Sequence, residues 1–125
     1  MDPIADLLSA IKNSMMARKQ RVFVRYSKIK AEICQIFKDK SVIDDFRIVA
    51  EDNCKYIEVL IHDRAKVMHL RRISKPGKRV FVKSKDLKSP LSRLGFYIVS
   101  TPRGILTGLE AKKIGTGGEI ICEVW

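Results

Sequence analysis

The uneven distribution of charge along the chain is the feature that most constrains its fold. Residues 1–62 carry 11 Lys and Arg against 9 Asp and Glu, whereas residues 63–125 carry 14 against 5. The net charges of the two halves are therefore +2 and +9, which sum to the +11 of the whole chain. Between Asp63 and Glu110 the only acid is Asp86, set among 12 Lys and Arg. A surplus of this size must lie partly on one face, and a folded chain tolerates it mainly when a polyanion neutralises the charge.

The polyanion that this surplus favours is a nucleic acid. An anionic membrane surface is a weaker alternative. No apolar run approaches the roughly 20 residues that a membrane span needs. A solvated basic face without a partner is the remaining alternative, but ordinary solubility requires a net charge of only about 2 to 8. The N-terminus has no basic region followed by an apolar one, so no signal peptide is expected.

Apolar periodicity predicts the order α-β-α-β-β for the first half of the chain. Both helices have cap residues that satisfy the free amides of a first helical turn. The expected elements are a helix beginning at Pro3 after the cap Asp2, a strand over 21–26, a helix capped by Ser27, and strands over 42–49 and 56–61 joined through 51–53.

A charged break over 62–66 separates this half from a β-rich second half with short helices. Proline followed by glycine in Lys75-Pro76-Gly77-Lys78 is the pattern of a type II turn, and it predicts a hairpin with Arg79 beside its basic tip. The other expected elements are strands over 67–74 and 79–83, a short helix from Ser89 to Gly95, strands over 97–101 and 105–107, a helical turn with a capping box from Thr107 to Glu110, and a last strand over 119–125. The predicted fold class is α+β with two small lobes, 1–62 and 63–125.

Patterns for catalysis, metal binding or cofactor binding are not found in the sequence. His62 and His69 are the only histidines, and 115–118 lacks the Gly-Lys-Ser/Thr of a phosphate-binding loop. The three cysteines are odd in number and far apart, which suits small apolar residues in a reducing compartment. We therefore expect no enzymatic activity, no cofactor and no metal. A nucleic-acid-processing enzyme stays an alternative that requires a cluster of acids or a His–nucleophile pair in the basic half.

Short polar side chains among the basic residues favour RNA over DNA. Ser74, Ser100, Thr101 and Thr116 fall on predicted strands and turns, where they suit the shallow minor groove and irregular loops of RNA. A DNA reader more often presents a basic recognition helix, so a sequence-specific DNA regulator is the second alternative. The run 117–119 is either a tight turn or a place where backbone amides approach a phosphate or a base edge.

Five segments, taken in this order and spacing, carry a family resemblance that spans the chain. They are Asp2-Pro3-Ile4-Ala5-Asp6, Ile11-Lys12-Asn13, Ser74-Lys75-Pro76-Gly77, Ser100-Thr101-Pro102-Arg103-Gly104-Ile105 and Gly117-Gly118-Glu119-Ile120-Ile121-Cys122. Together they resemble the bacterial-type family of small-subunit ribosomal protein number eight. The resemblance implies a structural constituent of the small subunit that binds the central domain of its rRNA directly and supports assembly. The implied partners are an rRNA hairpin and neighbouring small-subunit proteins, without DNA or membrane, in a bacterial cytoplasm or the stroma or matrix of an organelle.

The resemblance also implies which residues contact RNA. Ser100 and Thr101 are expected to hydrogen-bond an extruded base and the adjoining backbone, and the glycines to permit close approach. Glu119 is expected to accept from a base amine or a sugar hydroxyl, or to brace the loop. The complete set of expected RNA-binding residues is Ser100, Thr101, Arg103, Gly104, Gly117, Gly118 and Glu119, the tip residues Lys75, Pro76, Gly77, Lys78 and Arg79, and the N-terminal residues Asn13, Ser27, Lys28 and Lys30.

Two positions depart from the family pattern. Pro102 stands where the family usually has serine, which removes a hydroxyl and an amide donor and weakens the expectation of a contact there, although proline stiffens the turn. Glu123 stands where the family commonly has tyrosine. The final Trp125 occurs in some plastid and bacterial members, so an organellar origin stays open.

Overall fold

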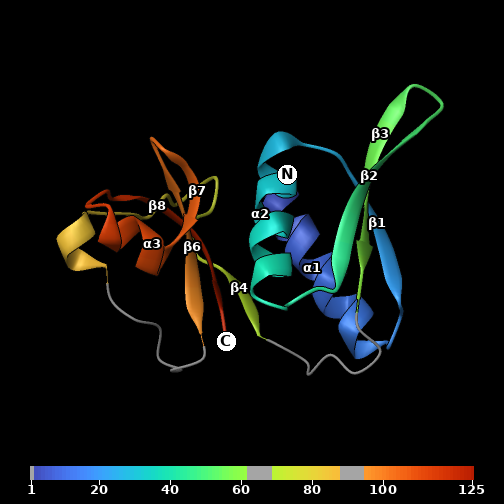
Figure 1. Cartoon of the computed structure of the whole chain (residues 1–125), viewed down its shortest axis with the longest axis horizontal. Coiled ribbons are helices and arrows are strands. Elements are labelled where there is room, and N and C mark those ends of the chain that lie inside the picture. Colours follow the sequence, from blue (N-terminus) through green and yellow to red (C-terminus); the bar gives the residue numbers. More distant parts are fainter. Residues whose placement is uncertain (1, 62–68, 88–94) are drawn as a thin grey trace. The chain divides into compact units, whose positions relative to one another are not determined.

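The computed structural model describes residues 2–61, 69–87 and 95–125. The chain divides into two units: Pro3–Met68, here the N-terminal unit, and His69–Trp125 with Met1–Asp2, here the C-terminal unit. The first unit contains an antiparallel sheet of three strands and the second one of five, each accompanied by helices (Figure 1). The predicted α+β class is thereby confirmed. The predicted charged break over 62–66 lies outside the described residues.

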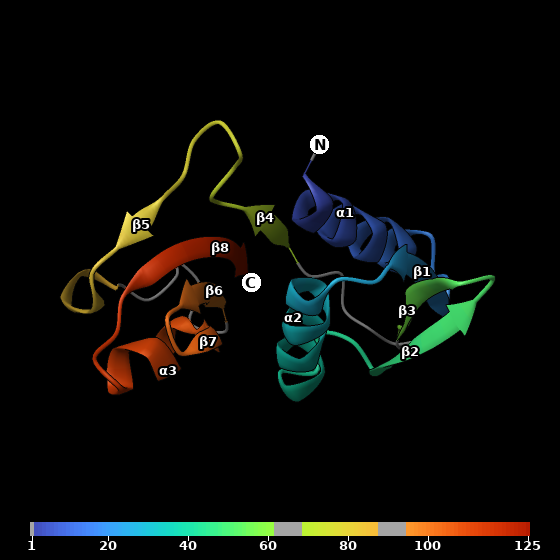
Figure 2. The ribbon, with the colours of Figure 1, turned by 90° about the horizontal axis from the view of Figure 1, so that it is seen from above.

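The N-terminal unit has the predicted order of elements. They are α1 (Pro3–Met16), β1 (Arg21–Arg25), α2 (Lys28–Asp39), β2 (Asp45–Glu51) and β3 (Cys54–Leu60). The strand order is β1-β3-β2, and both helices lie on one face of this sheet (Figure 2). Fully buried side chains from the helices and from the central strand, including Leu7, Ile33, Phe37, Ile57 and Val59, form the core between them.

The turn after α2 replaces the predicted beginning of a strand at Val42. Ser41 has a left-handed φ of 60°, and the amides of Val42 and Ile43 both donate to the carbonyl of Phe37. The two apolar side chains are each 1% exposed, so they fill the core from a turn and not from a strand. Apolar alternation alone was therefore misleading here, and β2 begins only at Asp45.

The C-terminal unit is built around its last strand. Its elements are β4 (Leu70–Arg72), β5 (Phe81–Val82), the 3-10 turn η1 (Ser84–Asp86), β6 (Phe96–Thr101), β7 (Gly104–Thr107), α3 (Gly108–Lys113) and β8 (Gly118–Val124). The strand order is β4-β8-β6-β7, and β5 pairs with the beginning of β8. The predicted capping box is confirmed, because the Thr107 hydroxyl accepts from the Glu110 amide while the Glu110 carboxylate accepts from the Thr107 amide. Leu87, Val99 and Ala111 are buried together between the sheet and α3.

Several predictions for this unit were wrong in detail. Lys75 and Lys78 exchange two backbone hydrogen bonds of 2.9 Å, as a two-residue turn requires. Gly77, however, does not take the positive φ that the second central residue of a type II turn requires, so the turn is not type II. The φ that Pro76 fixes is equally that of the first central residue of a type I turn. The flanking strands are shorter than predicted, and η1 was not predicted. Residues 67–68 and most of the predicted helix from Ser89 to Gly95 lie outside the described residues.

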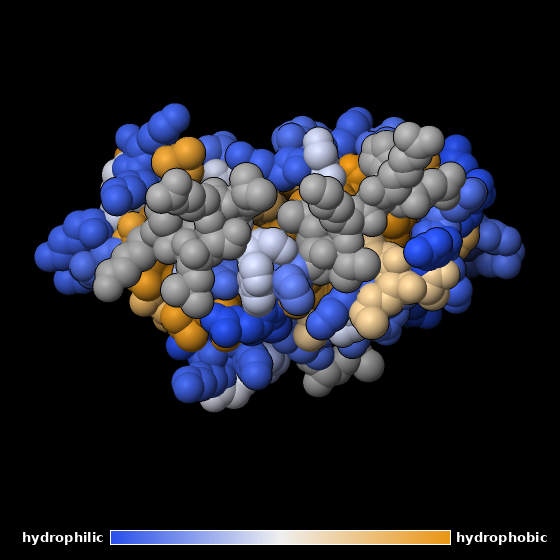
Figure 3. Space-filling view, turned by 90° about the horizontal axis from the view of Figure 1, so that it is seen from below, coloured by the Kyte–Doolittle hydropathy of each residue, from blue (hydrophilic) through white to orange (hydrophobic). Residues whose placement is uncertain are grey.

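The face of the molecule seen in Figure 3 is mainly polar where its residues are described. Hydrophilic side chains predominate there, and apolar ones appear in smaller patches between them. None of the helices within residues 2–61, 69–87 and 95–125 has the length and hydropathy needed to cross a membrane. Within the same ranges, His, Cys, Asp and Glu side chains form no group of three or more that could hold a metal ion.

Candidate nucleic-acid interface

The beginning of β8 brings together the C-terminal segments that the sequence singled out. In the register of the sheet, Glu119 lies opposite Ser100 of β6 on one side and opposite Phe81 of β5 on the other. Gly118 lies opposite Val82 in the same ladder. Three segments far apart in the chain therefore form neighbouring strands, and β8 is the strand between them.

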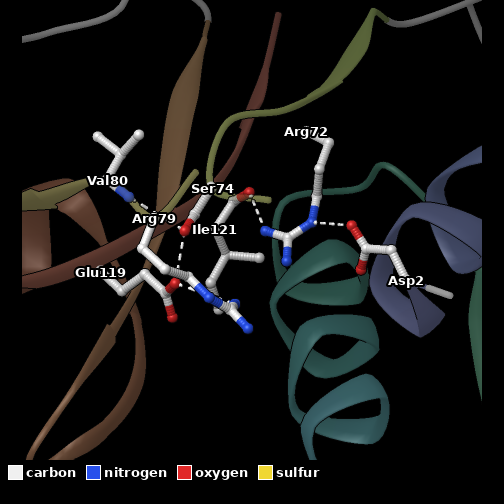
Figure 4. A network of polar contacts seen from close by, with 7 residues as sticks. All are labelled: Asp2, Arg72, Ser74, Arg79, Val80, Glu119 and Ile121. Atoms are coloured by element: carbon white, nitrogen blue, oxygen red, sulfur yellow. Dashed lines mark hydrogen bonds and ion pairs between the residues drawn. The ribbon is translucent and has the colours of Figure 1, made fainter. Parts of the chain in front are cut away.

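A buried hydroxyl connects the basic hairpin to this strand. Ser74 is 0% exposed, and its hydroxyl accepts from the Val80 amide at 3.2 Å while it donates to the Glu119 carboxylate at 2.5 Å (Figure 4). The Arg79 guanidinium donates to the same carboxylate oxygen at 3.3 Å. Two backbone bonds run in parallel, from the Ser74 amide to the Ile120 carbonyl and from the Ile120 amide to the Val80 carbonyl. We call Ser74, Arg79, Val80 and Glu119 the brace, since together they hold both ends of the hairpin against β8.

The two glycines at the start of β8 allow the backbones of the neighbouring strands β5 and β6 to pack closely against it. A Cβ at Gly118 would overlap the Ser100 carbonyl oxygen and lie 2.9 Å from its carbon. A Cβ at Gly117 would overlap the Val82 carbonyl oxygen and lie 2.8 Å from the Lys83 Cα. The absence of side chains at these positions is thus required by strand packing, whether or not RNA is bound.

The turn between β6 and β7 is held by its own threonine. The Thr101 hydroxyl donates to the Gly104 carbonyl at 2.8 Å and accepts from the Arg103 amide at 3.1 Å. Gly104 has a φ of 113°, a conformation that side chains disfavour. Pro102 and Arg103 are exposed at the outside of the turn. The amide that bonds the threonine belongs to Arg103, so the amide hydrogen that Pro102 lacks is not needed for this bond.

Ser100 differs from Thr101 in having an unused hydroxyl. It is half-buried in β6, opposite both Glu119 and Ile105, and its side chain makes no hydrogen bond to any residue in the described part of the chain. Of the two hydroxyls predicted to contact RNA, that of Ser100 is the one still available as both donor and acceptor.

The surface around these groups is basic and carries an exposed aromatic ring. Lys75, Lys78, Arg79 and Lys83 are all exposed, and Phe81 between them is 68% exposed. Phe81 is absent from the set of predicted contacts. The sequence signal that could have identified it is its position, two residues from both Arg79 and Lys83, which puts all three side chains on the same side of a strand.

The predicted contacts of the N-terminal unit divide into two kinds. Asn13 and Lys28 are exposed on α1 and α2. Ser27 caps α2 by accepting from the Lys30 amide at 3.2 Å. Lys30 is only 7% exposed, and its ammonium group donates to the Arg25 carbonyl at 3.0 Å. Ser27 and Lys30 thus have structural roles within this unit.

Glu123 is accommodated by polar neighbours inside the sheet. It lies opposite Tyr97 in β6 and Arg71 in β4, and the Arg71 guanidinium approaches its carboxylate to 3.7 Å. Burial, and then a hydrogen bond to Glu123, raise the pKa of the Tyr97 phenol. Glu123, where the resemblance expects tyrosine, is therefore compensated by a positive partner, Arg71, and by a hydrogen-bonding partner, Tyr97.

Comparison with known proteins assigns the family of this two-unit α+β chain. The family described as "Ribosomal protein S8" matches residues 2–125. The chain is 39% identical to "Small ribosomal subunit protein uS8" of Acidobacterium capsulatum over 128 residues, which cover 99% of this chain and 97% of that protein. It is 41% identical to the protein of the same name from Dictyoglomus thermophilum (99% and 97% covered) and 40% identical to that of Burkholderia cenocepacia (98% and 96%). The chain therefore belongs to the Ribosomal protein S8 family, whose members are structural constituents of the small ribosomal subunit and not enzymes.

Proposed function

We propose that this protein binds directly to the central domain of small-subunit rRNA, at a distorted stretch of an rRNA hairpin, and supports assembly of the subunit. The supporting observation is the meeting of three segments at the start of β8: the basic hairpin, the β6–β7 turn and the glycine-rich strand end. They belong to the half of the chain that carries 14 Lys and Arg against 5 Asp and Glu. The N-terminal unit would then contact neighbouring rRNA and small-subunit proteins.

Each part of this interface has a chemical role in the proposal. Lys75 and Lys78 at the hairpin tip neutralise phosphates, which gives a salt-dependent but sequence-independent term. The Ser100 hydroxyl contacts a base or a sugar hydroxyl of an irregular RNA segment. Phe81 offers a flat apolar surface for an unstacked base. Glu119 and Thr101 hold these groups in place, because the Glu119 Oε2 and the Thr101 hydroxyl already form hydrogen bonds within the protein.

Competition binding at moderate salt tests the proposal. The full chain is titrated with the central-domain rRNA hairpin in the presence of a plain RNA duplex of equal length, and separately in the presence of a DNA duplex. A strong preference for the hairpin is expected, since shape and unpaired bases distinguish it from both competitors. Equal binding to all three would contradict the proposal, and a preference for one DNA sequence would instead favour a DNA regulator.

Substitution of Ser100 by alanine tests the contact itself. One lost hydrogen bond is worth about 1 kcal/mol, so the affinity for the hairpin should fall about fivefold. Ser9→Ala, at an exposed position of α1, is the matched control and should leave the affinity unchanged. An unaltered affinity in a folded Ser100→Ala variant would remove this residue from the interface.

A further inference from the structure

The three-stranded sheet of the N-terminal unit has a second face, directed away from α1 and α2. Along β1 the side chains alternate, so Val22 and Val24 are half-buried whereas Arg21, Phe23 and Arg25 are exposed. In the register of the sheet, Phe23 of β1 and Arg47 of β2 lie opposite the same residue of the central strand, Glu58. We call Arg21, Phe23, Arg25, Arg47 and Glu58 the outer face.

Glu58 is the buried acid that pairs with two arginines of the outer face. Its side chain is only 4% exposed, and both of its carboxylate oxygens accept from the Arg47 guanidinium, at 2.9 and 3.2 Å. The Arg21 guanidinium approaches the same carboxylate to 3.9 Å. These two arginine side chains nevertheless stay 65% and 60% exposed. The acid therefore holds two guanidinium groups at the surface, which reduces the conformational entropy that they would lose on binding an anion.

The charge of the outer face is positive toward solvent. Glu58 is enclosed by the arginines, and the Asp45 carboxylate at the edge of the face is already paired with Lys38 at 3.1 Å. The guanidinium of Arg25 makes no ion pair within the part of the chain that the structure describes.

Phe23 is placed between these cations and is not covered by them. Its side chain is 53% exposed, with Arg21 and Arg25 two residues away on either side of it along β1. Strand geometry sets the Cα atoms of these two arginines about 7 Å from the Cα of Phe23, on the same side of the strand. An exposed ring between cations is the combination that binds a single nucleic-acid strand, because bases stack on the ring while phosphates contact the cations. The other apolar side chains that alternate to this face, those of Val49, Tyr56 and Leu60, are half-buried, so the exposed part of the face is one ring among arginines.

We propose that the outer face is a second RNA-binding surface, which takes an unpaired RNA segment by stacking a base on Phe23 and pairing its phosphates with Arg21, Arg25 and Arg47. This surface lies in the N-terminal unit and shares no residue with the interface around β8. Its ligand is a single-stranded or irregular region of RNA, and the binding does not depend on a particular sequence.

A fluorescent reporter at the ring position tests this proposal in the full chain. The parent carries Trp125→Phe and Phe23→Trp, so that its single indole lies on the outer face. A saturating amount of the rRNA hairpin first occupies the proposed β8 interface, and a 12-nucleotide single-stranded RNA of mixed sequence is then added. Stacking should quench the indole in a saturable titration. Ile48→Trp in the same Trp125→Phe background is the control, because Ile48 is 51% exposed but alternates to the opposite side of the sheet.

Removal of one cation gives the second readout. Arg25→Gln is chosen because it leaves both arginine contacts of Glu58 intact. In the reporter protein it should weaken binding severalfold and lower the slope of log K against log salt by about 0.7, the value for one phosphate of a single strand. Lys19→Gln, also exposed and outside this face, should change neither.

The outcomes separate this proposal from the proposed function. Absence of quenching at position 23, equal quenching at position 48, or an unchanged salt slope in Arg25→Gln would each overturn the outer face as an RNA surface. If the hairpin itself fails to bind, the proposed function is contradicted. The titration without hairpin then still decides whether RNA reaches position 23.

Discussion

Removal of the Ser74 hydroxyl should destabilise the C-terminal unit more than an ordinary serine substitution. The hydroxyl is fully buried, and it makes one hydrogen bond to a neutral amide and one to a carboxylate. A neutral bond contributes about 0.5–1.5 kcal/mol and a bond to a charged group about 1.5–3. Ser74→Ala should therefore lower the free energy of unfolding by about 2–4.5 kcal/mol. The ion pair between Arg79 and Glu119 adds little, since Arg79 is half-exposed and exposed pairs are worth about 0–1 kcal/mol.

A double-mutant cycle isolates the bond between the two buried groups of the brace. Ser74→Ala, Glu119→Ala and the double variant are unfolded with urea and followed by the fluorescence of Trp125, the only tryptophan, which pairs with His69 in the C-terminal unit. The coupling energy should be about 1.5–3 kcal/mol, because each single variant already breaks the shared bond. Ser9→Ala is the control for serine removal and should lie within about 0.5 kcal/mol of the wild type.

The reasoning would be refuted by additive effects. If the two substitutions sum to within about 0.5 kcal/mol of the double variant, Ser74 and Glu119 do not act as a unit. A Ser74→Ala variant of wild-type stability would show that its hydroxyl is dispensable. In the proposed function, a weakened brace should also reduce the affinity for the rRNA hairpin, since Lys75 and Lys78 are carried on the segment that it holds.

Three other substitutions or treatments have expected outcomes. Gly118→Ala should cost at least about 2 kcal/mol in urea unfolding, because its Cβ overlaps a strand backbone that has little room to move; a neutral effect would contradict the close approach. Burial raises the pKa of the Cys34 and Cys122 thiols to about 12, so at pH 8 a thiol reagent should label the half-exposed Cys54 first, and mass spectrometry of a folded sample that finds equal labelling would oppose this. Thr107→Ala should lose about 1 kcal/mol of stability and Thr107→Ser should recover most of it, since the cap needs the hydroxyl and not the methyl group.

Local signals in the sequence predicted those elements whose geometry depends on a few neighbouring residues. Ser27 was predicted as a cap and accepts from the amide three residues on. The hairpin through Asp52 and Asn53 was also predicted, and these two residues take the left-handed φ values of 49° and 63° that a tight hairpin turn needs. In these cases one side chain or one short backbone segment determines the conformation, so a single sequence suffices.

Features that depend on contacts between distant segments were not predictable in the same way. The family resemblance implied that Gly118 permits close approach of RNA, but strand β6, nearly 20 residues earlier, is what fills the space beside it. Val42 and Ile43 alternate with polar residues as a strand would, yet the core accepts them from a turn. The pairing of Ser74 with Glu119 spans 45 residues, and no periodicity in either segment indicates it.

The structure also changes how a family resemblance should be carried over to single residues. A side chain can recur in a family because it binds RNA or because it holds the residues that do, and the sequence does not distinguish the two roles. The hydrogen bonds that a side chain already makes help to distinguish these roles. The Thr101 hydroxyl both donates and accepts within its turn, whereas the Ser100 side chain next to it makes no hydrogen bond in the described part of the chain. The Glu119 carboxylate receives two donors that come from the basic hairpin. An acid at the centre of a basic surface is then no obstacle to binding an anion, because its charge serves to order the cations around it, as Glu58 does in the other unit.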